Sequence, residues 1–228
     1  DSLADVEDPL PPALRMEKGL LGLSDALRGV HRPPDRDAID AAHRRLRFEE
    51  AFDLQVVLAQ RRHERLAQAA TPRPPSGEGL VAAFGERIPY ALTSAQERVG
   101  QEISADLSGN HPMQRLIQGD VGSGKTVVAA LAGMLAVEAG KQVALAAPTE
   151  LLAEQHLANL RAWLEPLGVR VAWLAGKVTG KARATVLAQV ASGEAQVVVG
   201  THALMQEAVT FHDLGLAIVD EQHRFGVH

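Results

Sequence analysis

The sequence of 228 residues contains no cysteine, few aromatic residues and no long apolar run. Without cysteine, disulfides and thiolate metal sites are excluded. Phe, Trp and Tyr make up 4% of the chain, which favours helices packed on aliphatic strands over an aromatic-rich β-sandwich. The longest apolar run, residues 127–137, has about eleven residues, whereas roughly twenty are needed to cross a bilayer. It therefore predicts a buried helix and no membrane contact.

Positive charge is also in short supply. The net charge of −5 would weakly repel a polyanion, so any contact with nucleic acid requires a local basic surface. The first residues, DSLADVEDP, have neither the basic nor the apolar region of a signal peptide, which predicts a cytoplasmic protein. Because the chain lacks an initial Met and stops soon after an acidic motif, we expect it to be a piece of a longer protein.

Proline and glycine divide the chain into three expected parts. Residues 1–34 are proline-rich and predict an irregular lead-in with one short helix at 20–27. Residues 35–79 contain an uninterrupted helical pattern to about residue 70, as one long helix or two joined end to end, followed by the linker TPRPPSGEG. Residues 80–228 form the third part.

The predicted long helix carries several arginines interspersed with acidic residues at helical spacing. This pattern favours a solvated face with ion pairs over a surface that contacts nucleic acid. The basic residues concerned are Arg44, Arg45, Arg47, Arg61, Arg62 and Arg65.

The third part alternates helices with short β-branched runs, which predicts an α/β fold with a mostly parallel sheet. In such folds, ligands bind beyond the carboxyl ends of the strands. Strands are expected at residues 115–118, 142–147, 169–174, 196–199 and 214–219.

The string GDVGSGKT has the composition of a P-loop and precedes the apolar helical run. Backbone N–H groups of such a loop surround phosphates, Lys125 reaches the β and γ oxygens, and the Thr126 hydroxyl ligates Mg²⁺. A chance glycine-rich turn is the alternative, and the strand, loop and helix context argues against it. The predicted nucleotide-binding residues are Gly119, Asp120, Val121, Gly122, Ser123, Gly124, Lys125 and Thr126.

A second acidic motif follows the last predicted strand, in LGLAIVDEQH. Asp220 is expected to hold Mg²⁺ through water, and Glu221 to polarise the water that attacks the γ-phosphate. Two adjacent acids could instead stabilise a helix N-terminus through the helix dipole. The upstream P-loop favours the catalytic interpretation.

With Gln222 and His223 the motif reads DEQH, which resembles superfamily 2 helicases. The resemblance implies that His223 touches the γ-phosphate and signals to the rest of the motor. LTSAQ resembles the adenine-side motif of this superfamily, which implies that Gln96 contacts adenine. The same residues also form a capping box, Thr93 to Gln96, that would open a helix.

Two further strings resemble the DNA-contacting motifs of the superfamily, APTELLAEQH (147–156) and GTHAL (200–204). Thr149 and Thr201 follow strands, where hydroxyl and N–H groups could hold a DNA phosphate, although either threonine could simply cap a helix. In the loop at 174–183, Lys177 and Lys181 could add ionic contacts to DNA or remain solvated.

The strings PMQRLIQGDVGSGKTVVA, APTELLAEQH, GTHALMQE and DEQHRFGVH together resemble the RecG family of bacterial ATP-dependent DNA helicases over residues 80–228, with a looser match upstream. The resemblance implies a first RecA-like motor lobe, ATP and Mg²⁺ as cofactors, and branched DNA, such as stalled forks and Holliday junctions, as partner. It also implies that a wedge domain and a second lobe with an arginine finger lie outside these residues. This chain alone is therefore expected to turn ATP over slowly.

Other functions remain open at this stage. Transcription-repair coupling factors share the GDVG and RFGV strings, but their acidic motif usually has Glu and Gln before the Arg, whereas this chain has Gln222 and His223. A non-helicase P-loop ATPase would not need the two DNA-contact motifs. A pure interaction module would dock a partner through the arginine-bearing helix.

Overall fold

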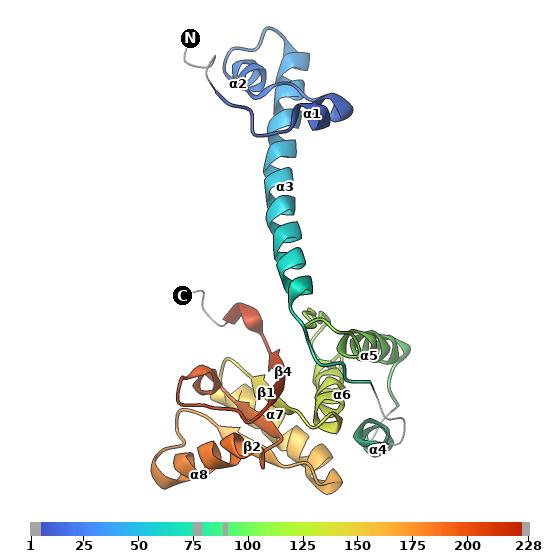
Figure 1. The fold of residues 1–228 in the computed structure, drawn as a ribbon, viewed down its shortest axis with the longest axis vertical. Helices are drawn as coiled ribbons and strands as arrows, with labels where there is room; N and C mark the ends of the chain where they lie inside the picture. Colours follow the sequence, from blue (N-terminus) through green and yellow to red (C-terminus); the bar gives the residue numbers. More distant parts are fainter. Residues whose placement is uncertain (1–5, 75–78, 89–90, 225–228) are drawn as a thin grey trace. The chain divides into compact units, whose positions relative to one another are not determined.

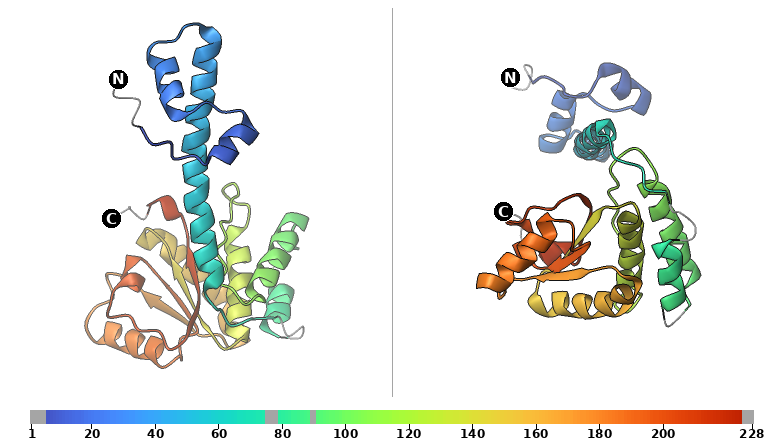
Figure 2. Two further views of the ribbon diagram at one scale, coloured as in Figure 1. Left: turned by 45° about the horizontal axis from the view of Figure 1, so that its top comes forward. Right: turned by 60° about the horizontal axis from the view of Figure 1, so that its bottom comes forward.

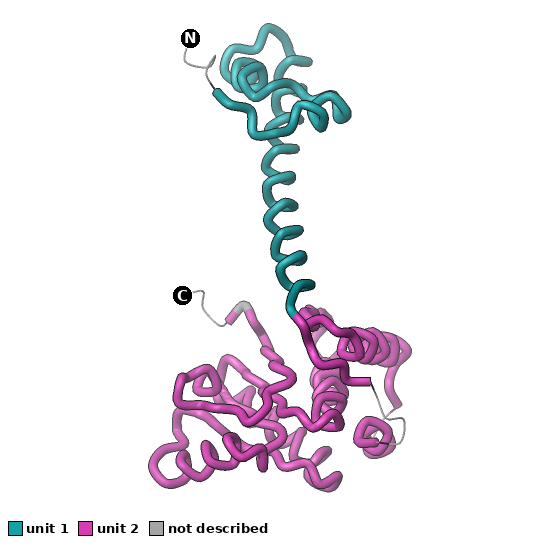
Figure 3. Tube along the Cα trace, in the orientation of Figure 1, with its two compact units in different colours: residues 1–68 teal, residues 69–228 magenta. Residues whose placement is uncertain are grey.

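The structure, a computed structural model, describes residues 6–74, 79–88 and 91–224 and divides into two units, one ending at Gln68 and the other beginning at Ala69 (Figure 3). The first unit is helical, and the second combines helices with a sheet (Figure 1). The helices of the first unit are α1 (Pro12–Lys18), α2 (Leu23–His31) and α3 (Arg36–Ala67). The helices of the second are α4 (Leu80–Arg87), α5 (Ser94–Leu107), α6 (Lys125–Glu138), α7 (Glu150–Leu164) and α8 (Gly180–Ala191), with 3₁₀ turns η1 (Glu165–Leu167), η2 (His202–Met205) and η3 (Gln222–Arg224).

The proline-rich lead-in is more regular than expected. It contains both α1 and α2 among its described residues, where the sequence predicted one short helix at 20–27. Pro12 occupies the first turn of α1, a position where proline costs no hydrogen bond. Gly19 then ends α1 in the left-handed conformation, with φ of 59°. These prolines therefore begin a helix, which is why the prediction of an irregular segment was wrong.

Helix α3 is a single helix of 32 residues, as the uninterrupted pattern allowed. The Asp35 side chain accepts a hydrogen bond from the N–H of Ala38 at 2.8 Å and caps the first turn. Helix α2 packs on α3 through small residues, because a methyl group added to Gly29 would lie 3.0 Å from Cβ of Ala42. The close approach of the two helices thus depends on glycine at this position.

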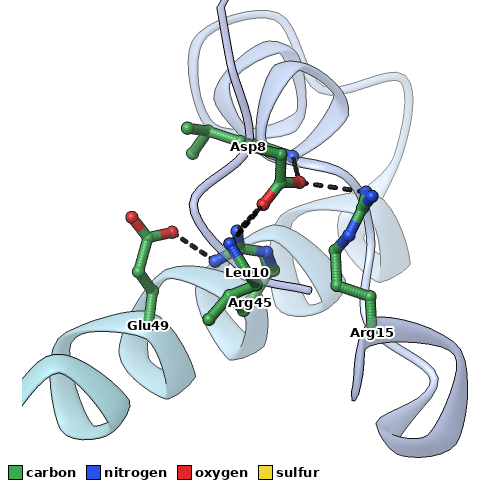
Figure 4. A network of polar contacts seen from close by, with 6 residues as sticks. Asp8, Leu10, Arg15, Arg45 and Glu49 are labelled. Atoms are coloured by element: carbon green, nitrogen blue, oxygen red, sulfur yellow. Dashed lines mark hydrogen bonds and ion pairs between the residues drawn. The ribbon is translucent and has the colours of Figure 1, made fainter. Parts of the chain in front are cut away.

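Arg45 is fully buried, which contradicts its predicted place on a solvated face. Its guanidinium pairs with Asp8 at 2.7 Å and with Glu49 on the next turn of α3 (Figure 4). Burial by itself would raise the pKa of Asp8, but hydrogen bonds from the N–H groups of Leu23 and Leu10 and from Arg45 hold that pKa below its ordinary value. Spacing along α3 could not show that Asp8, far away in the sequence, would cover Arg45.

Replacing Arg45 with alanine is expected to destabilise the first unit by about 3 kcal/mol, because the Asp8 and Glu49 carboxylates would lose their buried partner. Far-UV circular dichroism during urea unfolding measures the loss of helix. Fluorescence provides an internal control, since both tryptophans, Trp163 and Trp173, belong to the second unit and should keep their transition. Arg62→Ala on the exposed part of α3 is the matched variant and should leave both transitions in place. A helix transition unchanged by Arg45→Ala would contradict this account.

Within the described part of the second unit, four parallel strands form one sheet in the order β2-β3-β1-β4. The strands are β1 (Gln142–Ala146), β2 (Val171–Leu174), β3 (Val197–Gly200) and β4 (Leu214–Val219). All four agree with predicted strands to within two residues. The parallel α/β architecture expected from the alternating pattern is therefore confirmed.

Helices cover both faces of the sheet (Figure 2). On one face, Val143 and Leu145 of β1 pack in a cluster with Met134 of α6 and Leu160 of α7. On the other face, Ala146 lies in a smaller cluster with residues of α8. Successive side chains of a strand point to opposite faces, so full burial of β1 requires a helical layer on each side.

The strand predicted at residues 115–118 does not form in the structure. Arg115 is instead held by α5, with hydrogen bonds to Asp106 at 2.8 Å and to Glu102 at 2.5 Å. Leu116 is 71% exposed, and Ile117 packs against the cluster around Ile103. Leu116 and Ile117 are the only two apolar residues of this segment, and Arg115 holds the segment to α5. Too little apolar surface therefore remains to be buried for these residues to form a further strand. Strand β4 is consequently at the edge of the sheet.

The predicted linker at residues 71–79 is described only in part, since residues 75–78 lie outside the described ranges. Two hydrogen bonds of 2.8 Å hold the chain here to the end of α5 and the residues after it. The N–H of Ala70, just before the linker, donates to the carbonyl of Asn110, and the N–H of Arg73 donates to the carbonyl of Leu107. The start of this segment is thus hydrogen-bonded to the second unit.

Gly200, at the end of β3, is expected to tolerate no side chain. A methyl group there would lie 1.9 Å from the carbonyl oxygen of Leu174 on the neighbouring strand, so β2 and β3 would have to separate. Gly200→Ala should lower the free energy of unfolding of the second unit by about 3 kcal/mol or more, measured by urea unfolding with tryptophan fluorescence. Gly100→Ala, within α5 and with ordinary contact to Leu131, is the control and should stabilise by about 0.5–1 kcal/mol. Equal stability of the two variants would contradict this prediction.

Candidate nucleotide-binding site

The predicted P-loop leads directly into α6, which begins at Lys125. Gly122 and Gly124 have φ values of 84° and 79°, a backbone conformation that other residues adopt only with strain. Gly124 is also the N-cap of α6 and has no side chain with which to cap it. The N–H of Val127 donates to the Gly124 carbonyl, and the N–H groups of Lys125 and Thr126 precede it at the helix start, where an anion such as a phosphate can bind.

The Lys125 side chain curls back into the loop. Its ammonium donates hydrogen bonds to the carbonyl oxygens of Gly119 at 2.7 Å and Asp120 at 2.9 Å. The N–H of Ser123 donates to the Asp120 carbonyl and closes a turn at the tip, where Val121 is fully exposed. An ammonium and several N–H groups gathered around one loop fit the phosphates of a nucleotide.

Gln96 contacts the P-loop directly. Its side-chain amide donates a hydrogen bond to the Ser123 carbonyl at 2.9 Å. Its Oε1 atom accepts the N–H of Thr93, while the Thr93 hydroxyl accepts the N–H of Gln96, so the predicted capping box is present at the start of α5. The same amide group that closes the capping box therefore also holds the P-loop. A contact with adenine remains a prediction.

The P-loop and the acidic motif both lie at the carboxyl ends of the parallel strands. Helix α6 is connected to β1 by residues 139–141 only, so it runs antiparallel to β1 and begins near the carboxyl end of that strand. Strand β4 is parallel to β1, and the N–H of Asp220 donates to the carbonyl of Ala146, the last residue of β1. Connections of this kind bring ligand-binding residues to the same edge.

Asp220 is held from both sides of its carboxylate. One oxygen lies 2.7 Å from Nε2 of His156 on α7, and the other accepts the N–H of Glu221 at 3.0 Å. Glu221 has φ of 49°, an unusual conformation for a residue other than glycine. Among the residues that the structure describes, no group of three or more His, Asp or Glu side chains could hold a metal ion alone. Protein sites for Mg²⁺ often have one or two carboxylates and complete their ligands with phosphates and water.

His156, the last residue of APTELLAEQH, was not among the predicted site residues. The signal was available: His156 follows buried Ala153 by one helical turn, which places both on the face of α7 directed toward the sheet. For His223, the backbone belongs to η3, but the side chain lies outside the described atoms. Its predicted contact with the γ-phosphate stays a prediction.

The three predicted DNA contacts have different environments. Thr149 is exposed at the start of α7, and its hydroxyl accepts the N–H of Leu152 at 3.3 Å, so it caps the helix. Lys177 forms ion pairs with Glu150 and Glu154, and the Glu154 hydrogen bond raises the pKa of its ammonium. Thr201 is 3% exposed, and its hydroxyl is buried without a hydrogen-bond partner. Its predicted contact with a DNA phosphate stays a prediction, and such a contact would require the buried hydroxyl to become accessible.

The parallel sheet, the P-loop at the start of α6 and the acidic residue after β4 define a P-loop nucleotide-binding lobe of the RecA-like type. The chain belongs to the DEAD/DEAH box helicase family, which matches residues 93–228. It is 52% identical over 213 residues to the ATP-dependent DNA helicase RecG of Pasteurella multocida (strain Pm70), a match that covers 90% of this chain and 31% of the relative.

RecG of Escherichia coli (strain K12) is 49% identical over 236 residues, with 98% of this chain and 33% of the relative covered. A solved structure of RecG bound to a three-way DNA junction superposes with a TM-score of 0.89 and 40% identity, and covers 99% of this chain and 31% of that chain. The chain thus spans about a third of the length of the curated relatives it matches. In the part that the structure describes, no helix is both long and apolar enough to span a membrane.

Proposed function

We propose that the chain is the ATP-binding motor lobe of a bacterial, cytoplasmic DNA helicase that acts on branched DNA in recombination and repair. The observation that carries the proposal is the P-loop at the uncapped start of α6, on the same edge of the sheet as Asp220. Similarity to RecG helicases over nearly the whole chain supports branched DNA as the substrate. We divide the chain into three parts: a lead-in (1–34), a helix and linker (35–79) and the motor lobe (80–228).

Each half of the site has a proposed task. The N–H groups of the P-loop and the Lys125 ammonium bind the phosphates of ATP, and Lys125 exchanges its bonds to the Gly119 and Asp120 carbonyls for bonds to the β and γ oxygens. The Thr126 hydroxyl and Asp220 hold Mg²⁺, which when bound neutralises phosphate charge. Glu221 orients the attacking water, and His223 senses the γ-phosphate.

DNA would lie along the loops after β1 and β2. Thr149 and the N–H groups at the start of α7 are suited to bind a phosphate without reading bases. Lys177 would exchange its ion pairs with Glu150 and Glu154 for a DNA phosphate. Thr201, which follows β3, is a further proposed phosphate contact, for which its buried hydroxyl would have to become accessible. The remaining parts of the motor, a wedge domain and a second RecA-like lobe, would come from elsewhere in a longer chain.

The test is ATP hydrolysis by a full-length helicase containing this chain, compared on forked, linear duplex and single-stranded DNA at one fixed salt concentration. Forked or junction DNA is expected to stimulate hydrolysis most. Equal stimulation by linear duplex would assign the chain to a duplex translocase of the transcription-repair coupling type. Hydrolysis that no DNA stimulates would favour a P-loop ATPase that is not a helicase.

A further inference from the structure

His156, the last residue of the first DNA-contact motif, connects helix α7 to the acid of the nucleotide site. It lies on α7, the helix capped by Thr149, and its Nε2 atom is 2.7 Å from Oδ2 of Asp220. The His156 side chain is 12% exposed and that of Asp220 28%. Both groups are thus largely removed from solvent, where a hydrogen bond fixes side-chain position more firmly than at an open surface.

The direction of this hydrogen bond follows from chemistry. An ionised carboxylate only accepts hydrogen bonds, so Nε2 of His156 carries a hydrogen and donates a hydrogen bond to Oδ2 of Asp220. Oδ1 of Asp220 is already bound to the N–H of Glu221. The two bonds together restrain rotation of the carboxylate, and the remaining lone pairs of its oxygens set where a Mg²⁺-bound water can be held.

The backbone around Asp220 offers less restraint of its own. Strand β4 lies at the edge of the sheet, and Glu221 follows in a strained conformation with φ of 49°. Helix α7, by contrast, is anchored in the core through Ala153, Leu160 and Leu164. Through its hydrogen bond, His156 therefore restrains the Asp220 carboxylate, at the end of edge strand β4, relative to the well-packed helix α7.

We propose that His156 is a positioning residue for Asp220, and that through it the placement of α7 sets how well the site holds Mg²⁺·ATP. The inference rests on the proposed function, in which Asp220 is a Mg²⁺ ligand and α7 begins at a DNA phosphate. Partners that orient metal ligands typically change metal affinity or activity by about 10–100-fold when removed. The hydrogen bond to His156 has the geometry of such a partner.

The experiment compares three variants in a full-length helicase containing this chain. His156→Phe keeps a ring of similar shape without a donor, and His156→Gln keeps an N–H donor at about the same reach. His212→Gln replaces an exposed histidine of the same unit and is the control. Binding of a fluorescent ATP analogue is measured against Mg²⁺ concentration, and the rate of ATP hydrolysis is measured over the same Mg²⁺ range, with and without forked DNA.

His156→Phe is expected to raise the Mg²⁺ concentration for half-maximal binding of the analogue, and for half-maximal hydrolysis, by about tenfold, whereas His156→Gln and His212→Gln stay within about twofold of the unmodified protein. If His156→Phe does not fold, as judged by circular dichroism, His156→Leu supplies a second side chain without a donor. An unchanged Mg²⁺ dependence in a folded variant without the donor overturns the proposal, even if the melting temperature falls.

A failure of this proposal is separable from a failure of the proposed function. If forked DNA does not stimulate the unmodified protein, the helicase assignment fails, but the Mg²⁺ dependence of basal hydrolysis still tests His156. If forked DNA stimulates all variants and the Mg²⁺ curves coincide, the helicase assignment stands and the positioning role of His156 is wrong.

Discussion

Replacing Lys125 with alanine in a full-length helicase containing this chain is expected to lower kcat for ATP hydrolysis by at least about 10²-fold. The ammonium of Lys125 lies inside the P-loop, bound to the Gly119 and Asp120 carbonyls, and is the cation that this loop places next to its own N–H groups. In the transition state negative charge develops on the γ-phosphoryl oxygens, and a fixed positive charge stabilises that state more than the ground state. The larger effect should therefore fall on kcat rather than on KM.

The measurement is steady-state hydrolysis over a range of ATP concentrations with saturating forked DNA. Lys141→Ala is the matched control, because Lys141 lies at the amino end of β1, away from the P-loop, and pairs with Asp213 there. The control should keep the rate of the unmodified protein. A Lys125→Ala variant that retains more than a third of that rate would remove Lys125 from the proposed mechanism.

The isolated chain of 228 residues is expected to hydrolyse ATP at least about 10³-fold more slowly than a full-length helicase that contains it. In the proposed full-length helicase, an arginine finger from the second lobe would neutralise part of the charge on the γ-phosphoryl group, and such a finger contributes about 10³–10⁵ to kcat in P-loop enzymes. The chain spans about a third of the length of its RecG relatives. The contacts from its own P-loop and Asp220 therefore support binding more than turnover.

Two measurements on the isolated chain separate binding from turnover. Titration with a fluorescent ATP analogue should show saturable, Mg²⁺-dependent binding, and Lys125→Ala should weaken it. Hydrolysis by the same preparation should remain slow with or without forked DNA. Rapid, DNA-stimulated hydrolysis by the isolated chain would show that the P-loop and acidic motif suffice, and that the arginine-finger argument does not apply.

The sequence by itself determined the elements with a strong local signal. Strand β1 is an aliphatic run, and the P-loop requires glycine at the positions where φ is positive, so both follow from residue type. Helix α3 follows from a long pattern without glycine or proline and from Asp35 as its cap. The candidate nucleotide site was predicted from the sequence for a similar reason, since its glycines, lysine, threonine and acids occur in a fixed order along the chain.

Only the tertiary structure decided the features that depend on residues far apart in the sequence. Arg45 is buried because Asp8 covers it, and residues 115–118 form no strand because Arg115 pairs with α5. The Thr201 hydroxyl is buried without a hydrogen-bond partner, which its place after a strand did not indicate. The bond between His156 and Asp220 spans 64 residues, and helical spacing from Ala153 indicates the buried face of His156 but not its partner. Local propensity acts over a few residues, whereas ion pairs and burial are settled only when the chain has folded.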